Sequence, residues 1–90
     1  MPNIIEQRVT NSSIFVRATN GNTFNLTKAE IQAHAATETG TAAQRKAKTI
    51  TWVLNQMQAA LGADMVDITK VTVDVDLTLD SVPIILEEIS

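Results

Sequence analysis

One apolar stripe, running along a single long helix, limits the folds open to this chain. Between Thr41 and Leu61, apolar side chains recur at alternating spacings of four and three residues: Ala43, Ala47, Ile50, Leu54, Met57 and Leu61. This spacing is typical of an amphipathic α-helix with one face on a core. Such a helix is about 30 Å long from its rise per residue. It therefore predicts a sheet wide enough for the helix to cross.

Trp52 is the only tryptophan of the chain, and it lies nearly opposite this stripe, on the side that carries Arg45 and Lys48. If the stripe packs on a sheet, the indole points away from the domain. A large exposed aromatic side chain is typical of an interaction surface. We therefore predict that Trp52, Arg45 and Lys48 belong to an interface, either with another molecule or with another part of this chain.

Turn and cap signals divide the rest of the chain into short elements. Asn20-Gly21-Asn22 predicts a tight turn, and Thr27 with Glu30 predicts a capped helix start. Val71, Val73, Val75, Leu77 and Leu79 alternate with polar residues, which is typical of a half-buried strand. The expected order is strand, strand, helix, helix, strand, strand, at residues 3–10, 12–19, 28–37, 41–61, 70–79 and 82–89. The last segment fits a short helix almost as well.

These elements predict an α+β fold, in which two helices cover one face of an antiparallel sheet. Ninety residues suffice for one core, so residues 1–90 are expected to form a single domain.

Acidic side chains are concentrated at the end of the chain, where residues 63–90 carry seven acids and one base. Asp74 and Asp76 are expected on the outer face of their strand, where they complement Arg45 and Lys48 of a neighbouring copy. Two other interpretations stay open. The acids can simply keep a solvated face soluble, or the Asp74–Asp76 pair can hold a hard cation such as calcium or magnesium.

Residues with an evident chemical role are few. The chain has no cysteine and three glycines, and it contains none of the phosphate-binding or nucleophile motifs. His34 is the only histidine, without an evident nucleophile to serve. These observations predict a protein that is not an enzyme and needs no cofactor or metal.

The location of the protein is predicted from two further patterns. No run of eighteen apolar residues occurs, so no membrane span is expected. The start lacks the pattern of a signal peptide, which predicts a cytoplasmic protein or an intracellularly assembled particle.

The expected function is therefore structural: a module that self-associates as a homo-oligomer or docks on a larger scaffold. A composition rich in Thr and Asn with 3% aromatic residues looks like that of small accessory proteins of virus particles, especially of tailed phages. The alternative is a small nucleic-acid-binding protein that uses Arg45, Lys46, Lys48 and Trp52 on the second helix.

A resemblance bears on this alternative. The run Leu26–Ile31, a short helix, a break at Thr39-Gly40 and a long second helix resemble the N-terminal half of HU-type DNA-bending proteins. The family's Gly-Phe-Gly-type turn and basic β-arm are absent, and two strands precede the helices. The likeness is interpreted as shared helix-start chemistry and not as family membership.

Overall fold

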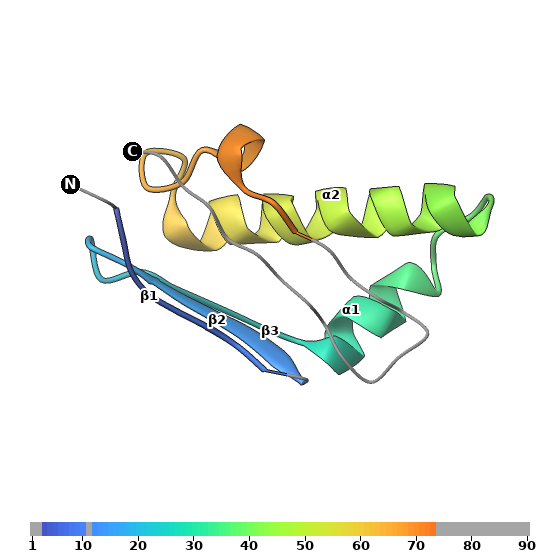
Figure 1. The fold of residues 1–90 in the computed structure, drawn as a ribbon, viewed down its shortest axis with the longest axis horizontal. Coiled ribbons are helices and arrows are strands. Elements are labelled where there is room, and N and C mark those ends of the chain that lie inside the picture. Colours follow the sequence, from blue (N-terminus) through green and yellow to red (C-terminus); the bar gives the residue numbers. More distant parts are fainter. Residues whose placement is uncertain (1–2, 11, 74–90) are drawn as a thin grey trace.

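The computed structural model describes residues 3–10 and 12–73. Three strands come first, β1 (Ile4–Val9), β2 (Ser13–Ala18) and β3 (Thr23–Thr27), followed by α1 (Lys28–Ala35), α2 (Ala42–Leu61) and a 3-10 helix, η1 (Ile68–Lys70). The strands form an antiparallel sheet in the order β1-β2-β3. α2 runs above the sheet, and α1 continues directly from the end of β3 (Figure 1). The predicted α+β fold is confirmed.

The predicted order of elements is only partly right. Residues Thr23–Thr27, expected to lead into the first helix, form strand β3, in which Phe24 and Leu26 are buried. β3 ends on the residue that caps α1, so no linker separates strand from helix. Val71 and Val73 are buried and Thr72 is exposed, in agreement with the predicted alternation, whereas Lys70 belongs to η1. The rest of the predicted strand and the segment 82–89 lie outside the described residues.

Both helix starts are specified by local hydrogen bonds. Thr27 Oγ1 accepts from Glu30 N at 3.2 Å, which confirms Thr27 as the N-cap and one half of the capping box predicted with Glu30. Thr41 and Gln44 form a reciprocal capping box at the start of α2, with bonds of 3.2 Å and 2.8 Å. Gly40 is required beside this box, because its φ is +109° and a Cβ there would lie 2.5 Å from Gln44 Oε1.

The predicted turn between β2 and β3 also caps the C-terminal end of α2. Gly21 has a φ of 91° in this turn. The side-chain amides of Asn20 and Asn22 both donate to Leu61 O, at 3.2 Å and 3.1 Å. Helix carbonyls in the last turn have no partner within the helix. The two asparagines therefore stabilise the turn and also fasten the C-terminal end of α2 to the sheet.

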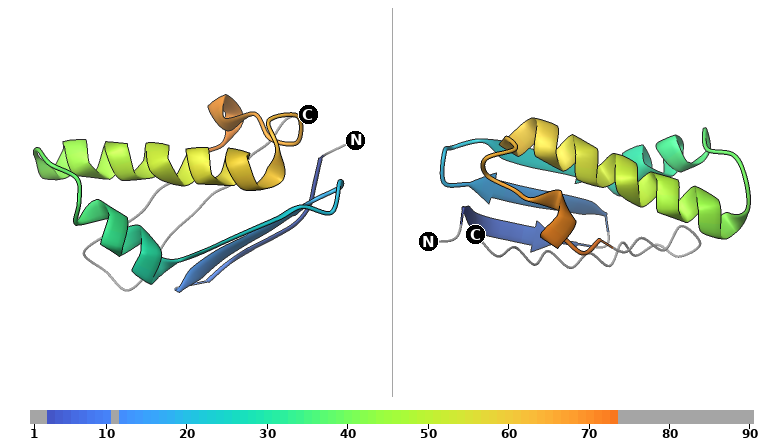
Figure 2. Two further views of the ribbon diagram at one scale, coloured as in Figure 1. Left: turned by 180° about the vertical axis from the view of Figure 1, so that it is seen from behind. Right: turned by 90° about the horizontal axis from the view of Figure 1, so that it is seen from above.

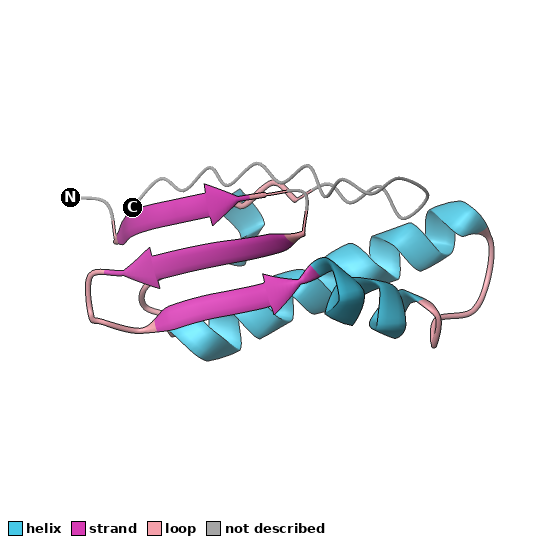
Figure 3. Ribbon diagram, turned by 90° about the horizontal axis from the view of Figure 1, so that it is seen from below, coloured by secondary structure: helices cyan, strands magenta, loops and turns pink. Residues whose placement is uncertain are grey.

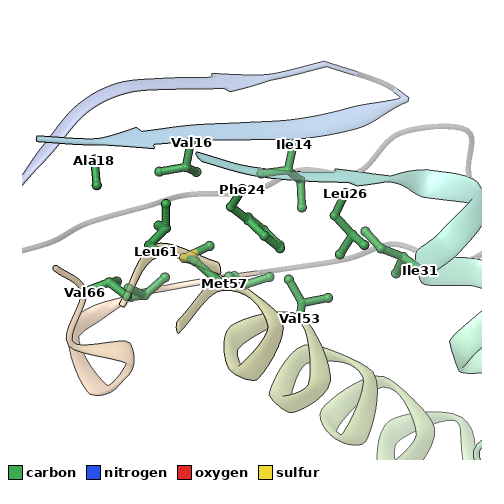
Figure 4. Close-up of a cluster of buried hydrophobic side chains, with 12 residues drawn as sticks. Ile14, Val16, Ala18, Phe24, Leu26, Ile31, Val53, Met57, Leu61 and Val66 are labelled. Atoms are coloured by element: carbon green, nitrogen blue, oxygen red, sulfur yellow. The ribbon is translucent and has the colours of Figure 1, made fainter. Parts of the chain in front are cut away.

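The core lies between the sheet and α2 (Figure 4). Ile14, Val16 and Ala18 of β2 point towards the helix, as the period of two predicts. From α2 the buried residues are Thr49, Val53, Met57 and Leu61. Thr49 is the polar member of this set, and its hydroxyl donates to Arg45 O at 2.8 Å.

The predicted stripe on α2 is therefore displaced. Met57 and Leu61 are buried as expected, Ile50 and Leu54 are half-buried, and Ala43 and Ala47 are exposed. The reason is visible in Figure 2, where the N-terminal half of α2 extends past the end of the sheet, next to α1. Val53 instead lies at the centre of the contact with the sheet.

This displacement predicts different costs for two truncations on α2. Met57→Ala should lower the free energy of unfolding by roughly 2–5 kcal/mol, because it leaves a cavity in the core. Leu54→Ala should cost clearly less, because its side chain is only half-buried. Urea unfolding measures both values. Equal losses, or a larger loss for Leu54→Ala, would contradict the arrangement of the helix.

Candidate interaction surfaces

Trp52 does not point away from the domain, so the orientation predicted for it is wrong. Its ring stacks on the imidazole of His34 from α1, with centroids 4.2 Å apart and planes within 7°. Trp52 is half-buried and packs against the margin of the core. His34 Nε2 in turn lies 2.9 Å from Glu38 Oε1. The prediction failed because α1 covers this flank of α2, and the pattern of one helix does not reveal its neighbour.

Arg45 is directed at the end of α1, and Lys48 at the loop that follows it. Lys48 Nζ donates to Thr39 O at 3.0 Å, and Arg45 Nη2 contacts Ala35 O at 3.5 Å. Carbonyls at a helix C-terminus carry partial negative charge, so the guanidinium of Arg45 is favourable beside Ala35 O. Both cations thus contact backbone carbonyls of their own chain, and their pairing with a neighbouring copy stays a prediction.

We call this set the α1–α2 junction: His34, Glu38, Arg45, Lys48 and Trp52. It also bears on the nucleic-acid alternative, which depends on three of the same side chains. A base can stack only on a free aromatic face, and His34 occupies one face of the indole. The junction thus leaves less of the predicted patch for a nucleic acid.

The remaining predicted interface residues, Asp74 and Asp76, lie outside the described residues, so their proposed pairing and the alternative cation site stay predictions. Within residues 3–10 and 12–73, no group of three His, Asp or Glu side chains could hold a metal ion.

A second surface, which the sequence analysis missed, follows β1. Ile5 and Val9 are the exposed large hydrophobic residues of the described chain, at 57% and 37% exposure, and both belong to this strand. In the described sheet β1 pairs with β2 alone, so its other edge is free there. The signal was present as apolar residues at both ends of the segment 4–9, but its irregular alternation concealed which side chains face the core.

The face of the sheet away from the helices is seen in front of them in Figure 3. It carries a small group of charged side chains. Cross-strand pairing sets Glu6 opposite Arg17 and Arg8 opposite Phe15. Glu6 binds Arg8 at 2.6 Å and Arg17 at 2.9 Å, and the guanidinium of Arg8 lies over the Phe15 ring, 5.5 Å from its centroid. We call these four residues the charged row.

The charged row perturbs the titration of its one acid. The hydrogen bond from Arg8, with the positive charges of Arg17 and Arg8, holds the pKa of Glu6 below its ordinary value. The carboxylate therefore stays ionised over a wider pH range than a free glutamate.

A polar depression of about 610 Å³ lies at the start of α1, lined by Ser12, Ser13, Asn25, Thr27, Lys28, Ala29 and Gln32. Helix N-termini of this kind attract anions when their amides are free. Here Lys28 N donates to Ser12 O at 2.8 Å and Glu30 N donates to Thr27 Oγ1. The chain itself satisfies these two amides.

Comparisons with protein-family models, with curated proteins and with solved structures found no match to this chain. Among the described residues, no helix has the length and apolar character needed to cross a membrane.

The junction predicts that Trp52 stabilises the isolated chain. Trp52→Ala should lower the free energy of unfolding by roughly 2 kcal/mol, because it removes a stacked ring and its apolar contacts. A double-mutant cycle with His34→Ala should show a coupling of about 0.5–1.5 kcal/mol. Gln56→Ala, at an exposed position of the same helix, is the control. An unchanged stability of Trp52→Ala would show that the ring is not part of the domain.

The charged row predicts an acid dependence with a definite sign. Because the pKa of Glu6 is lower in the folded chain, its contribution to stability is present above the ordinary carboxyl pKa. That contribution is lost as the pH falls through the lowered value. Carboxyl titration by NMR should show the lowered pKa, and Arg8→Gln should move it back towards the ordinary value. A normal pKa in the unsubstituted protein would contradict the observed pairs.

Proposed function

We propose that this protein is a non-enzymatic assembly module that associates with copies of itself, or joins a larger scaffold, through β1 and the adjoining outer face of the sheet. The single observation that carries the proposal is the position of Ile5 and Val9, both exposed and both on a strand with a free edge in the described sheet. The proposal keeps the function expected from the sequence but moves the surface away from Trp52, Arg45 and Lys48.

The physical argument begins with the backbone. A free strand edge presents unpaired N–H and C=O groups, and other chains add to such edges as further strands. Natural edge strands that stay solvated are often blunted by a bulge or by charges. β1 has both, with a shift of register between Ile4 and Glu6 and the charged row alongside. The exposed apolar side chains of Ile5 and Val9 have the opposite effect, because a partner strand that covers them removes apolar surface from water.

The charged row adds specificity to this surface. Arg8 keeps 66% of its side chain exposed although it contacts both Glu6 and Phe15. Side chains already ordered by their neighbours lose less conformational entropy when a partner binds. The row thus favours a partner with charges in a matching order.

The proposal includes the setting expected from the sequence, the cytoplasm or an intracellularly assembled particle. A tailed-phage particle is one such setting, supported by the low aromatic content and many Thr and Asn residues.

Light scattering over a concentration series tests the proposal. The unsubstituted protein should show a mass that rises above that of the monomer, and Ile5→Lys should return it to the monomer without loss of fold. Gln32→Lys places the same charge on an exposed position of α1 and should leave the mass unchanged. A monomer at every concentration would contradict self-association. A loss of association with Trp52→Ala, in a folded chain, would return the interface to the second helix.

A further inference from the structure

β1 is complementary to itself when two copies run in opposite directions. Glu6 and Arg8 stand on either side of Gln7, and Ile5 and Val9 occupy the next two positions. In an antiparallel pair centred on Gln7, Glu6 therefore lies opposite Arg8 of the second copy. By the same register Ile5 lies opposite Val9 of the second copy, and the two Gln7 residues face each other.

We infer that the partner of β1 is β1 of a second copy, paired antiparallel about a two-fold axis through Gln7. This inference rests on the proposed function and identifies its partner. A two-fold interface requires a surface that is its own complement. The segment Ile5–Val9 meets this requirement in both charge and apolar character.

The register with β2 shows which side chains share a face in this pairing. Glu6 and Arg8 lie opposite Arg17 and Phe15, on the outer face. Gln7 and Val9 lie opposite the buried Val16 and Ile14, so they belong to the face that the helices cover. Because the axis is perpendicular to the sheet, both copies turn the same face to the same side. The charges of the two copies thus meet on the outer face, and Val9 of each copy lies on the other face.

On the outer face, each Arg8 gains a second carboxylate. The row of one copy contains two arginines and one glutamate, so Glu6 is shared between Arg8 and Arg17. In the dimer the Glu6 of the second copy approaches the exposed side of Arg8. Opposite charges on directly opposed residues stabilise antiparallel pairs, and like charges destabilise them. The order Glu-Gln-Arg therefore favours this register over a shift of one or two residues.

The pairing also sets the two exposed hydrophobic residues opposite each other, Ile5 of one copy against Val9 of the other. Ile5 is 57% exposed and has no cross-strand partner in β2, because the register shift leaves it unpaired. Val9 is 37% exposed at the other end of the strand. The same bulge disturbs the strand beyond Ile5, so the ladder is short and the association is expected to be weak.

Cysteine cross-linking tests the register. The chain has no cysteine, so each single substitution gives one possible disulfide. Directly opposed residues of antiparallel strands have Cα atoms about 4.5–5.5 Å apart, which a disulfide can bridge. Gln7→Cys should form covalent dimers under a glutathione redox buffer at least about tenfold faster than Asn25→Cys, an exposed position of β3.

Charge exchange tests the pairing independently. Glu6→Arg alone and Arg8→Glu alone each place like charges opposite one another, and each should raise the Kd of self-association at least about tenfold. An equimolar mixture of the two variants restores opposite charges at both positions and should associate within about threefold of the unsubstituted protein. Glu30→Arg, the same change of charge on α1, is the control, and circular dichroism verifies the fold of each variant.

The outcomes separate the inference from the proposed function. An oligomer in which Gln7→Cys cross-links no faster than Asn25→Cys would overturn the β1 pairing but leave self-association in place. If the unsubstituted protein forms an oligomer but the mixture of Glu6→Arg and Arg8→Glu does not regain its affinity, the β1 pairing is likewise overturned and self-association remains. A protein that is monomeric at every concentration would overturn both.

Discussion

The contact between α2 and the inner face of β2 and β3 is the interaction on which the remaining structure depends. Val53, Met57 and Leu61 pack in one buried cluster with Ile14, Val16 and Phe24 of the sheet. The asparagines of the β2–β3 turn hold the last carbonyl of α2 in register with the sheet. α2 in turn contacts both α1 and η1.

The same contact explains why Arg45 and Lys48 of α2 bind backbone carbonyls of their own chain. Because α2 is longer than the sheet, its N-terminal half packs on α1 instead (Figure 2). Arg45 then contacts a carbonyl at the end of α1, Lys48 contacts one in the following loop, and Trp52 stacks on His34. Among the described residues, the helices lie on one face of the sheet, so they cover neither its opposite face nor the outer edge of β1. The candidate binding surface therefore lies on β1, away from α2.

β1 combines features that oppose strand pairing with features that favour it, as the proposed assembly function requires. The bulge and charges of β1 discourage indiscriminate pairing with other strands, which protects the free chain from aggregation. Ile5 and Val9 favour pairing with a partner that offers the right sequence of charges. A strand with these opposing features binds weakly and selectively, and weak contacts repeated over many copies produce stable assemblies.

Local patterns were sufficient for part of this structure. The Thr27 cap, the Asn20–Asn22 turn and the alternation of β2 each depend on residues close together in the chain, so they could be read without a fold. The burial of Trp52 and the partners of Arg45 and Lys48 could not, because α1 approaches them only after α2 has docked on the sheet. β3 was missed because five residues ending on a helix cap look like a lead-in until β2 lies beside them. The exposure of Ile5 and Val9 was likewise settled only in three dimensions, since side chains of an edge strand are buried or exposed according to how far the helices reach.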